Sequence, residues 1–246
     1  MESSITLAAS LMLGLAQPVC AANVAIDVGH YIARPGVISA RGVPEFEYNL
    51  QLAREIDAAL RHAGHTTLLI GDDGLGADLG KRAPRASRMD LFISIHHDSV
   101  QPRFLTDWQH EGQPRLYSDR FAGFSLFVSH LNPRLKSSLR CASAIGAELR
   151  RAGLVPSRYH ADPVVGENRP FADEANGVHY YDNLAVLKTA SVAALLMEAG
   201  VIVNRDEELR MRDPVVREKI AAGVTAAVSR CLQATRDEPR VTSERH

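Results

Sequence analysis

The feature that most constrains this chain is a series of short apolar segments, each of which is followed within two residues by a histidine or a glutamate. Residues 23–28, 91–95 and 193–197 are short and almost wholly apolar, as expected of strands that are buried on both faces of a sheet. Segments with helical periodicity separate them, and this alternation is typical of a parallel sheet. The sequence therefore predicts one α/β domain with a mainly parallel sheet of about six strands and helices on both faces.

The connecting segments complete this prediction. Strands are also expected at 66–70 and 124–129, and helices at 44–63, at 139–151, after Asn204 and from Pro214 onward. Pro44 suits a first helical turn, and the helix after it carries an apolar stripe. The segments 101–123 and 155–177 are polar and long, so we expect irregular loops that lie beside the functional site.

The N-terminus predicts export from the cytoplasm. Residues 7–16 form an apolar run that is shorter than the roughly 20 residues needed to span a bilayer. Small residues around Cys20 follow, as at a signal cleavage site. We expect a signal peptide at 1–22, a catalytic domain at 23–234 and a flexible tail at 235–246, with a periplasmic or secreted location. The alternative is a buried N-terminal strand or helix.

The net charge and the cysteines indicate which partners and which redox compartment suit this chain. The formal net charge is −1 and aromatic residues make up 6% of the chain. Neither value favours nucleic acid or an anionic membrane as a partner, and no later segment predicts membrane insertion. Cys141 and Cys231 remain after signal removal. They either pair in an oxidising compartment or pack as separate buried thiols.

Histidines follow two of the predicted strands. His30 comes directly after 23–28, where Gly29 frees the backbone to turn, and His96 and His97 follow 91–95. Neutral imidazole is the commonest metal ligand among side chains. Successive side chains on a strand point to opposite faces, so we expect only one of His96 and His97 to reach a shared site.

Two glutamates join these histidines as candidate residues of a metal-dependent active site. Glu45 and its rival Glu47 lie in the first turn of a predicted helix, where the helix dipole alone favours acidic residues. Glu198 ends the strand at 193–197, a costly place for a carboxylate unless it is paired in a salt bridge or functional. Two histidines and one glutamate form the ligand set of many catalytic zinc sites. A further carboxylate then acts as general base and acid.

Together these segments resemble the zinc-dependent N-acetylmuramoyl-L-alanine amidases of the amidase-3 type, over roughly residues 24–232. The resemblance rests on Asp27-Val28-Gly29-His30, on Gly42, Glu45 and Asn49-Leu50, on Ser94-Ile95-His96, and on Glu198-Ala199-Gly200 with Asn204. Its register selects Glu45 over Glu47 and His96 over His97. The chain departs from the family pattern at Val28, at Tyr31-Ile32 and at His97-Asp98.

The resemblance implies a function and roles for residues. It implies that His30, Glu45 and His96 bind one zinc ion, that Glu198 is the catalytic carboxylate, and that Lys188 contacts the peptide stem unless it is merely solvated. The implied reaction is hydrolysis of the amide between N-acetylmuramic acid and L-alanine in peptidoglycan. An activator protein as partner and gating or inhibition by 101–123 are further hypotheses. The alternatives are a carboxypeptidase-like zinc enzyme and a non-catalytic cell-wall-binding module.

Overall fold

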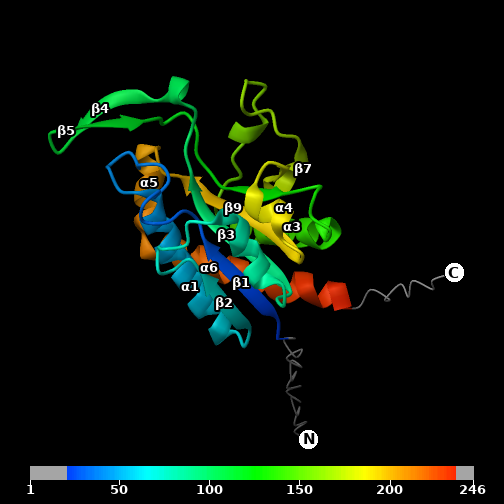
Figure 1. Ribbon diagram of the computed structural model, residues 1–246. Helices are drawn as coiled ribbons and strands as arrows, with labels where there is room; N and C mark the ends of the chain where they lie inside the picture. Colours follow the sequence, from blue (N-terminus) through cyan, green and yellow to red (C-terminus); the bar gives the residue numbers. More distant parts are fainter. Residues whose placement is uncertain (1–20, 237–246) are drawn as a thin grey trace, which may run out of the picture.

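A seven-stranded sheet forms the centre of the computed structural model, which describes residues 21–236 (Figure 1). Its order is β2-β1-β3-β9-β6-β8-β7. The strands are β1 (Asn23–Val28), β2 (Thr66–Ile70), β3 (Leu91–Asp98), β6 (Ser125–Val128), β7 (Phe171–Asp173), β8 (Val178–Tyr180) and β9 (Ala193–Val201). Neighbours are parallel except at the β6–β9 and β7–β8 pairs. The prediction of one α/β domain with a mainly parallel sheet is confirmed.

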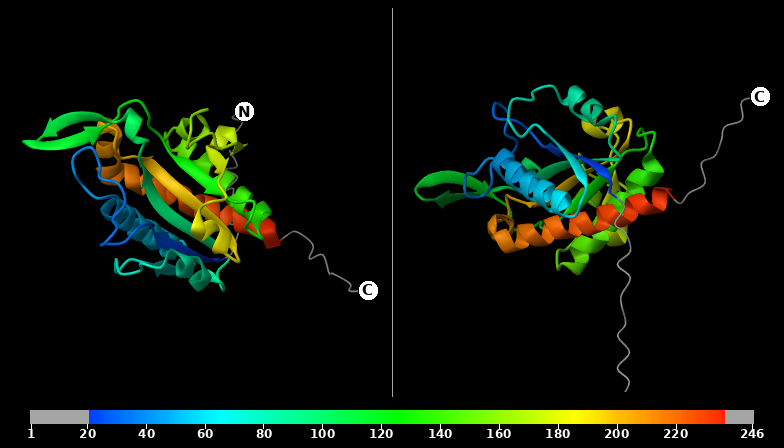
Figure 2. Two further views of the ribbon diagram at one scale, coloured as in Figure 1. Left: turned by 45° about the horizontal axis from the view of Figure 1, so that its top comes forward. Right: turned by 90° about the horizontal axis from the view of Figure 1, so that it is seen from below.

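Helices cover both faces of the sheet (Figure 2). On one face lie α1 (Glu45–His62), α3 (Leu135–Arg151) and α6 (Pro214–Arg236), with α5 (Arg205–Arg212) packed against α6 and β9. On the other lie α2 (Leu79–Arg82), the 3-10 turn Ala83–Ala86 and α4 (Ala185–Thr189). None of the helices within residues 21–236 is long and apolar enough to cross a membrane. Most of the predicted signal peptide, and the tail beyond Arg236, lie outside the described residues.

Alternation along the strands divides the core into two layers. Ile93 and Ile95 of β3 belong to the larger cluster, which lies between the sheet and α1, α3 and α6. Phe92 belongs to the smaller cluster, beneath α4 and Ala83–Ala86. This period of two continues into His96 and His97, so the two histidines leave β3 on opposite faces, as the sequence predicts.

A disulfide joins the two long helices on the larger-core side. Cys141 of α3 and Cys231 of α6 are bonded, 90 residues apart in the chain and with Cα atoms 5.1 Å apart. Of the two alternatives that the sequence leaves open, the structure shows the paired one.

The segment 101–123 is not an irregular loop, and that expectation was wrong. It contains an antiparallel hairpin of β4 (Thr106–His110) and β5 (Gln113–Tyr117), which projects from one end of the sheet (Figure 1). Glu111 and Gly112 both have positive φ, the geometry of a two-residue hairpin turn. The hairpin was missed because its strands are polar and largely exposed, so they lack apolar alternation.

The segment 155–177 also contains more regular structure than expected. It holds the 3-10 turns Tyr159–Ala161 and Glu174–Asn176 and the short strand β7, which pairs with β8. These two three-residue strands extend the sheet beyond β6. They are too short to give a periodic signal, which is why the sequence predicts about six strands rather than seven.

Candidate metal centre and active site

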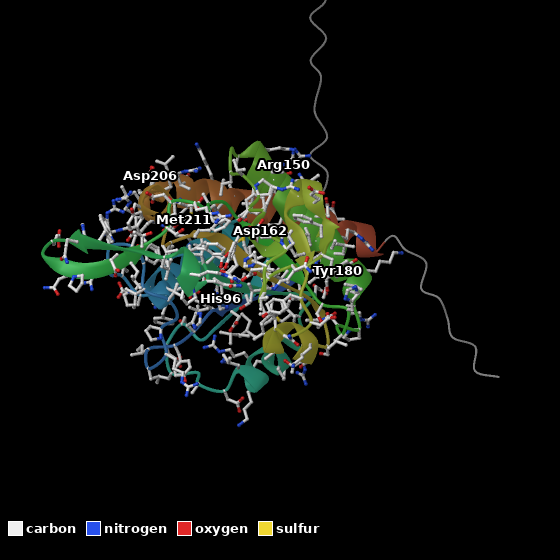
Figure 3. All side chains as sticks on the ribbon, turned by 90° about the horizontal axis from the view of Figure 1, so that it is seen from above. His96, Arg150, Asp162, Tyr180, Asp206 and Met211 are labelled. Atoms are coloured by element: carbon white, nitrogen blue, oxygen red, sulfur yellow. A yellow bond between two sulfur atoms is a disulfide. The ribbon has the colours of Figure 1, made fainter. Side chains whose placement is uncertain are left out.

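Three of the predicted site residues converge where β1 and β3 end. His30 Nε2 lies 2.9 Å from Glu45 Oε2, and His96 Nδ1 lies 3.0 Å from Glu45 Oε1. The ligand atoms of the three side chains all lie within 4.8 Å of one another. Viewed from above, His96 lies near the middle of the molecule, between the β4–β5 hairpin and the segment that carries Asp162 (Figure 3). We call these three residues the convergent cluster.

The turn that carries His30 is held in an uncommon conformation. His30 has φ 66°, in the left-handed region that non-glycine residues rarely adopt. The buried guanidinium of Arg82 donates to the backbone carbonyls of Val28 and His30 and forms an ion pair with Asp27 at 3.1 Å. No role for Arg82 was predicted, because it lies 52 residues from His30 and only the fold brings them together.

Two glycines leave the space that the cluster needs. A Cβ on Gly29 would lie 2.5 Å from the His96 ring, and a Cβ on Gly36 would lie 2.2 Å from Glu45 Oε2. The role expected for Gly29, freeing the backbone to turn, therefore needs correction. The left-handed residue is His30, and Gly29 is required because an imidazole packs directly against it.

The Glu45 carboxylate is buried, and both of its oxygens have hydrogen-bond partners. Besides the two histidines, its carboxylate accepts hydrogen bonds from Asn49 Nδ2 at 3.0 Å and from the amide of Val37 at 3.2 Å. Burial opposes the negative charge, but hydrogen bonds from His30 and His96 hold the pKa of this carboxyl well below its usual range. One ionised carboxylate between two imidazoles is a donor set that fits Zn²⁺.

The two rival residues lie elsewhere. Glu47 is exposed on the outer side of α1. His97 is buried against α1, with Nδ1 2.9 Å from Asn49 Oδ1, and burial lowers its pKa to about 3. His97 therefore positions Asn49, which in turn holds Glu45.

Glu198 lies on β9 directly beside His96, its register partner on β3. Its Oε2 is buried and has no hydrogen-bond partner among the described residues. Burial, together with the negative charges of Asp98 and Glu45, raises the pKa of this carboxyl well above its usual range. A carboxyl with one buried oxygen that lacks a partner, next to a possible metal site, is a candidate for proton transfer.

A second group of polar residues lies beyond Glu198 and was not predicted. His160 Nε2 lies 2.6 Å from Asp98 Oδ2, and His160 Nδ1 lies 2.8 Å from Glu167 Oε2. Arg169 pairs with Glu167 and contacts the same His160 nitrogen. We call these four residues the linear cluster. Asp98 ends β3, and the other three members come from the segment 155–177, which the sequence predicts as a loop.

Two hollows flank the convergent cluster. The smaller, of about 110 Å³, is lined by His30, His96, Arg82 and residues of α4. The larger, of about 620 Å³, lies between the 37–39 loop and the hairpin. Lys188 is on α4, but its side chain is exposed and lines neither hollow.

Comparison with known proteins shows which family this chain is similar to. The profile of a family described as N-acetylmuramoyl-L-alanine amidase matches residues 24–230. An amidase named AmiC from Neisseria meningitidis is 24% identical over 234 residues, covering 84% of this chain and 52% of that protein. A probable cell wall amidase, LytH, from Staphylococcus aureus is 23% identical over 203 residues, covering 82% of this chain and 55% of that protein. The chain thus spans about half the length of the curated relatives it matches.

A solved structure shares the fold. The amidase Ami1 from Mycobacterium smegmatis superposes with a TM-score of 0.69 at 21% identity, over 89% of this chain and all of that one. At this identity the likeness concerns the arrangement of helices and strands.

Proposed function

Because the chain belongs to the N-acetylmuramoyl-L-alanine amidase family, we propose that it hydrolyses the amide between N-acetylmuramic acid and L-alanine in peptidoglycan, with one zinc ion. The observation that carries the proposal is the convergence of His30, Glu45 and His96 within 4.8 Å. These three side chains would hold the metal. Zinc, when bound, supplies a Lewis acid that polarises a carbonyl and lets water ionise near neutral pH.

The chain's own residues account for the proton transfers. Glu198 accepts the proton of the attacking water and returns it to the departing amine of L-alanine. A carboxyl whose pKa is raised by burial suits both halves of this role, because it accepts a proton readily and can also release it. Arg82 and Asn49 act at a distance from the reaction, by holding the His30 turn and the Glu45 carboxylate.

The disulfide supports the predicted location. Bonds such as Cys141–Cys231 persist in oxidising compartments, which include the periplasm and the cell exterior. We therefore propose that the protein acts in the periplasm or after secretion, in keeping with the cell-wall role that the names of its relatives imply. Stem contact by Lys188, inhibition by 101–123 and an activator protein remain predictions.

The test combines metal analysis with product analysis. We expect about one zinc per chain in the wild type and a loss of more than about a hundredfold in zinc affinity in His96→Ala. His130→Ala, which removes an exposed histidine that pairs with Asp182, should retain both zinc and activity. Mass spectrometry of digested peptidoglycan should show whole peptide stems with L-alanine at a new N-terminus.

Two results would overturn the proposal. Release of a C-terminal amino acid from intact stems would identify a carboxypeptidase instead. A wild-type protein that stays free of metal and inactive after zinc is supplied would leave the wall-binding module as the better description.

A further inference from the structure

The larger hollow is a groove with an apolar lining beside the convergent cluster. Val37, whose amide donates to Glu45, lies in one wall, and Ser99, three residues after His96, lies in another. Its volume of about 620 Å³ is within the range of ligand-binding pockets. A molecule whose scissile bond lies at His30, Glu45 and His96 would therefore extend into this groove.

One charged residue lines this groove. The described lining residues are Val37, Ile38, Ser39, Ser99, Val100, Pro102, Leu105, Pro114, Arg115, Leu116 and Val203. Only Arg115 among them carries a charge, and no carboxylate of the described residues lies within ion-pair distance of it. Its guanidinium packs against the backbone of Gly42, where a Cβ would lie 2.5 Å from Nε. The cation is thus held in place without being neutralised.

Glu208, a buried acid that is linked to the groove residue Ser39, already has its own partners. The carboxylate of Glu208 accepts hydrogen bonds from Ser39, Arg41 and Tyr48. Arg115 is therefore available to an anion from outside the protein.

The wall that carries Arg115 is anchored at its base. Trp108 Nε1 donates to the Ala40 carbonyl at 3.1 Å, and the Ser118 amide donates to the Val203 carbonyl at 2.9 Å. The Arg205 guanidinium lies 3.8 Å from the Tyr117 ring centroid and pairs with Asp119. These contacts make the β4–β5 hairpin a fixed wall of the groove.

We propose that this groove binds the peptide stem of the substrate and that Arg115 pairs with a carboxylate of that stem. The inference rests on the proposed function and adds a substrate requirement to it. An apolar lining with one cation fits a peptide with alkyl and carboxylate groups. Sugar rings are typically held by aromatic stacking and many polar groups, and this groove has neither.

Binding of a released stem, which has no scissile amide left, tests the groove separately from catalysis. The probes are the tripeptide L-alanyl-γ-D-glutamyl-L-lysine with both carboxyl groups free and the same peptide with both amidated. Calorimetry on the full chain should show roughly tenfold tighter binding of the free acid. Arg115→Gln should remove this preference by weakening the acid form alone, and Arg115→Lys should retain part of it.

Arg120→Gln is the matched control, since Arg120 is exposed on the same segment and does not line the groove. It should leave both affinities unchanged, and thermal unfolding should show that all three variants are folded. Equal binding of the acid and amidated peptides by the wild type, or an undiminished preference in Arg115→Gln, would overturn the proposal. So would binding of peptide-free glycan that depends on Arg115.

The binding and cleavage assays together distinguish a failure of the groove assignment from a failure of the amidase assignment. If the protein cleaves peptidoglycan but shows no Arg115-dependent preference, the amidase assignment stands and the groove assignment fails. If the acid peptide binds through Arg115 but no stem is ever released, the groove binds anionic peptides and the amidase assignment fails.

Discussion

Two groups of histidine and carboxylate lie at the same end of the sheet, and their charges are arranged in opposite ways. In the convergent cluster one carboxylate, Glu45, lies between two imidazoles. In the linear cluster one imidazole, His160, lies between the carboxylates of Asp98 and Glu167. Residue types alone would make either group a candidate metal site.

Geometry and charge balance distinguish them. The convergent cluster gathers three ligand atoms within 4.8 Å of one another, and no other group among residues 21–236 does so. No Lys or Arg among the described residues pairs with Glu45, so its negative charge favours the binding of a cation. In the linear cluster Arg169 already pairs with Glu167, and His160 bridges the acids. We infer that convergence of the ligand atoms, rather than composition, distinguishes a candidate metal site.

The largest expected effect concerns Glu198, which lies beside the convergent cluster but outside it. We expect Glu198→Gln to bind zinc normally and to lose roughly a hundredfold to ten-thousandfold in kcat, because only proton transfer is removed. Metal content and the rate of stem release provide the measurement. Loss of zinc would make Glu198 a ligand, and full activity would remove it from the mechanism.

The sequence predicted those parts of the site that depend on local signals. His30, His96 and Glu198 each follow a buried apolar run, and parallel strands bring the residues after such runs to one edge of a sheet. Glu45 was a candidate because of its place in a first helical turn, but the choice over Glu47 rested on the family resemblance. In the structure Glu45 lies between His30 and His96, whereas Glu47 is exposed.

The parts that were missed depend on contacts between distant segments. Arg82 holds the His30 turn across 52 residues, and His160 reaches Asp98 across 62. The hairpin that carries Arg115 is held by Trp108 and Ser118, which bond to distant backbone atoms. None of these partners can be identified from periodicity or composition.

The second prediction tests whether the linear cluster is structural. His160→Phe leaves the Asp98 carboxylate buried without its imidazole, and we expect the free energy of unfolding to fall by about 3 kcal/mol. The metal-free proteins should be compared by denaturant unfolding. Zinc binding should be unchanged, because His160 contacts none of the three convergent residues. If His160→Phe instead retains its stability and loses zinc, the distinction between the clusters fails.

The matched control is His130→Phe. His130 also pairs with an aspartate, Asp182, but 51% of its side chain and 42% of its partner's are exposed. Solvent screens such pairs, so the loss should stay below about 1 kcal/mol. Equal losses in the two variants would mean that burial of the His160 pair contributes nothing.

The smallest expected effect comes from His179, which packs against the linear cluster with its ring centroid 5.9 Å from that of His160. Both ring nitrogens are buried without hydrogen-bond partners among the described residues. Burial, reinforced by His160, lowers the pKa of His179 from 6.5 to about 4. Between these values the unfolded chain binds a proton that the folded chain does not, so stability falls as the pH is lowered from 6.5 towards 4.

Comparison with His179→Phe isolates this effect from other titrating groups. Between about pH 7 and about pH 5, the wild type should lose about 2 kcal/mol more than the variant in the free energy of unfolding. Above pH 7 the difference between the two proteins should be constant, since His179 is neutral in both the folded and the unfolded chain. Parallel curves down to pH 5 would show that His179 takes up its proton in the folded protein as easily as in the unfolded one. Burial beside the linear cluster would then not oppose a positive charge on His179. The two clusters would in that case differ only in the geometry of their ligand atoms.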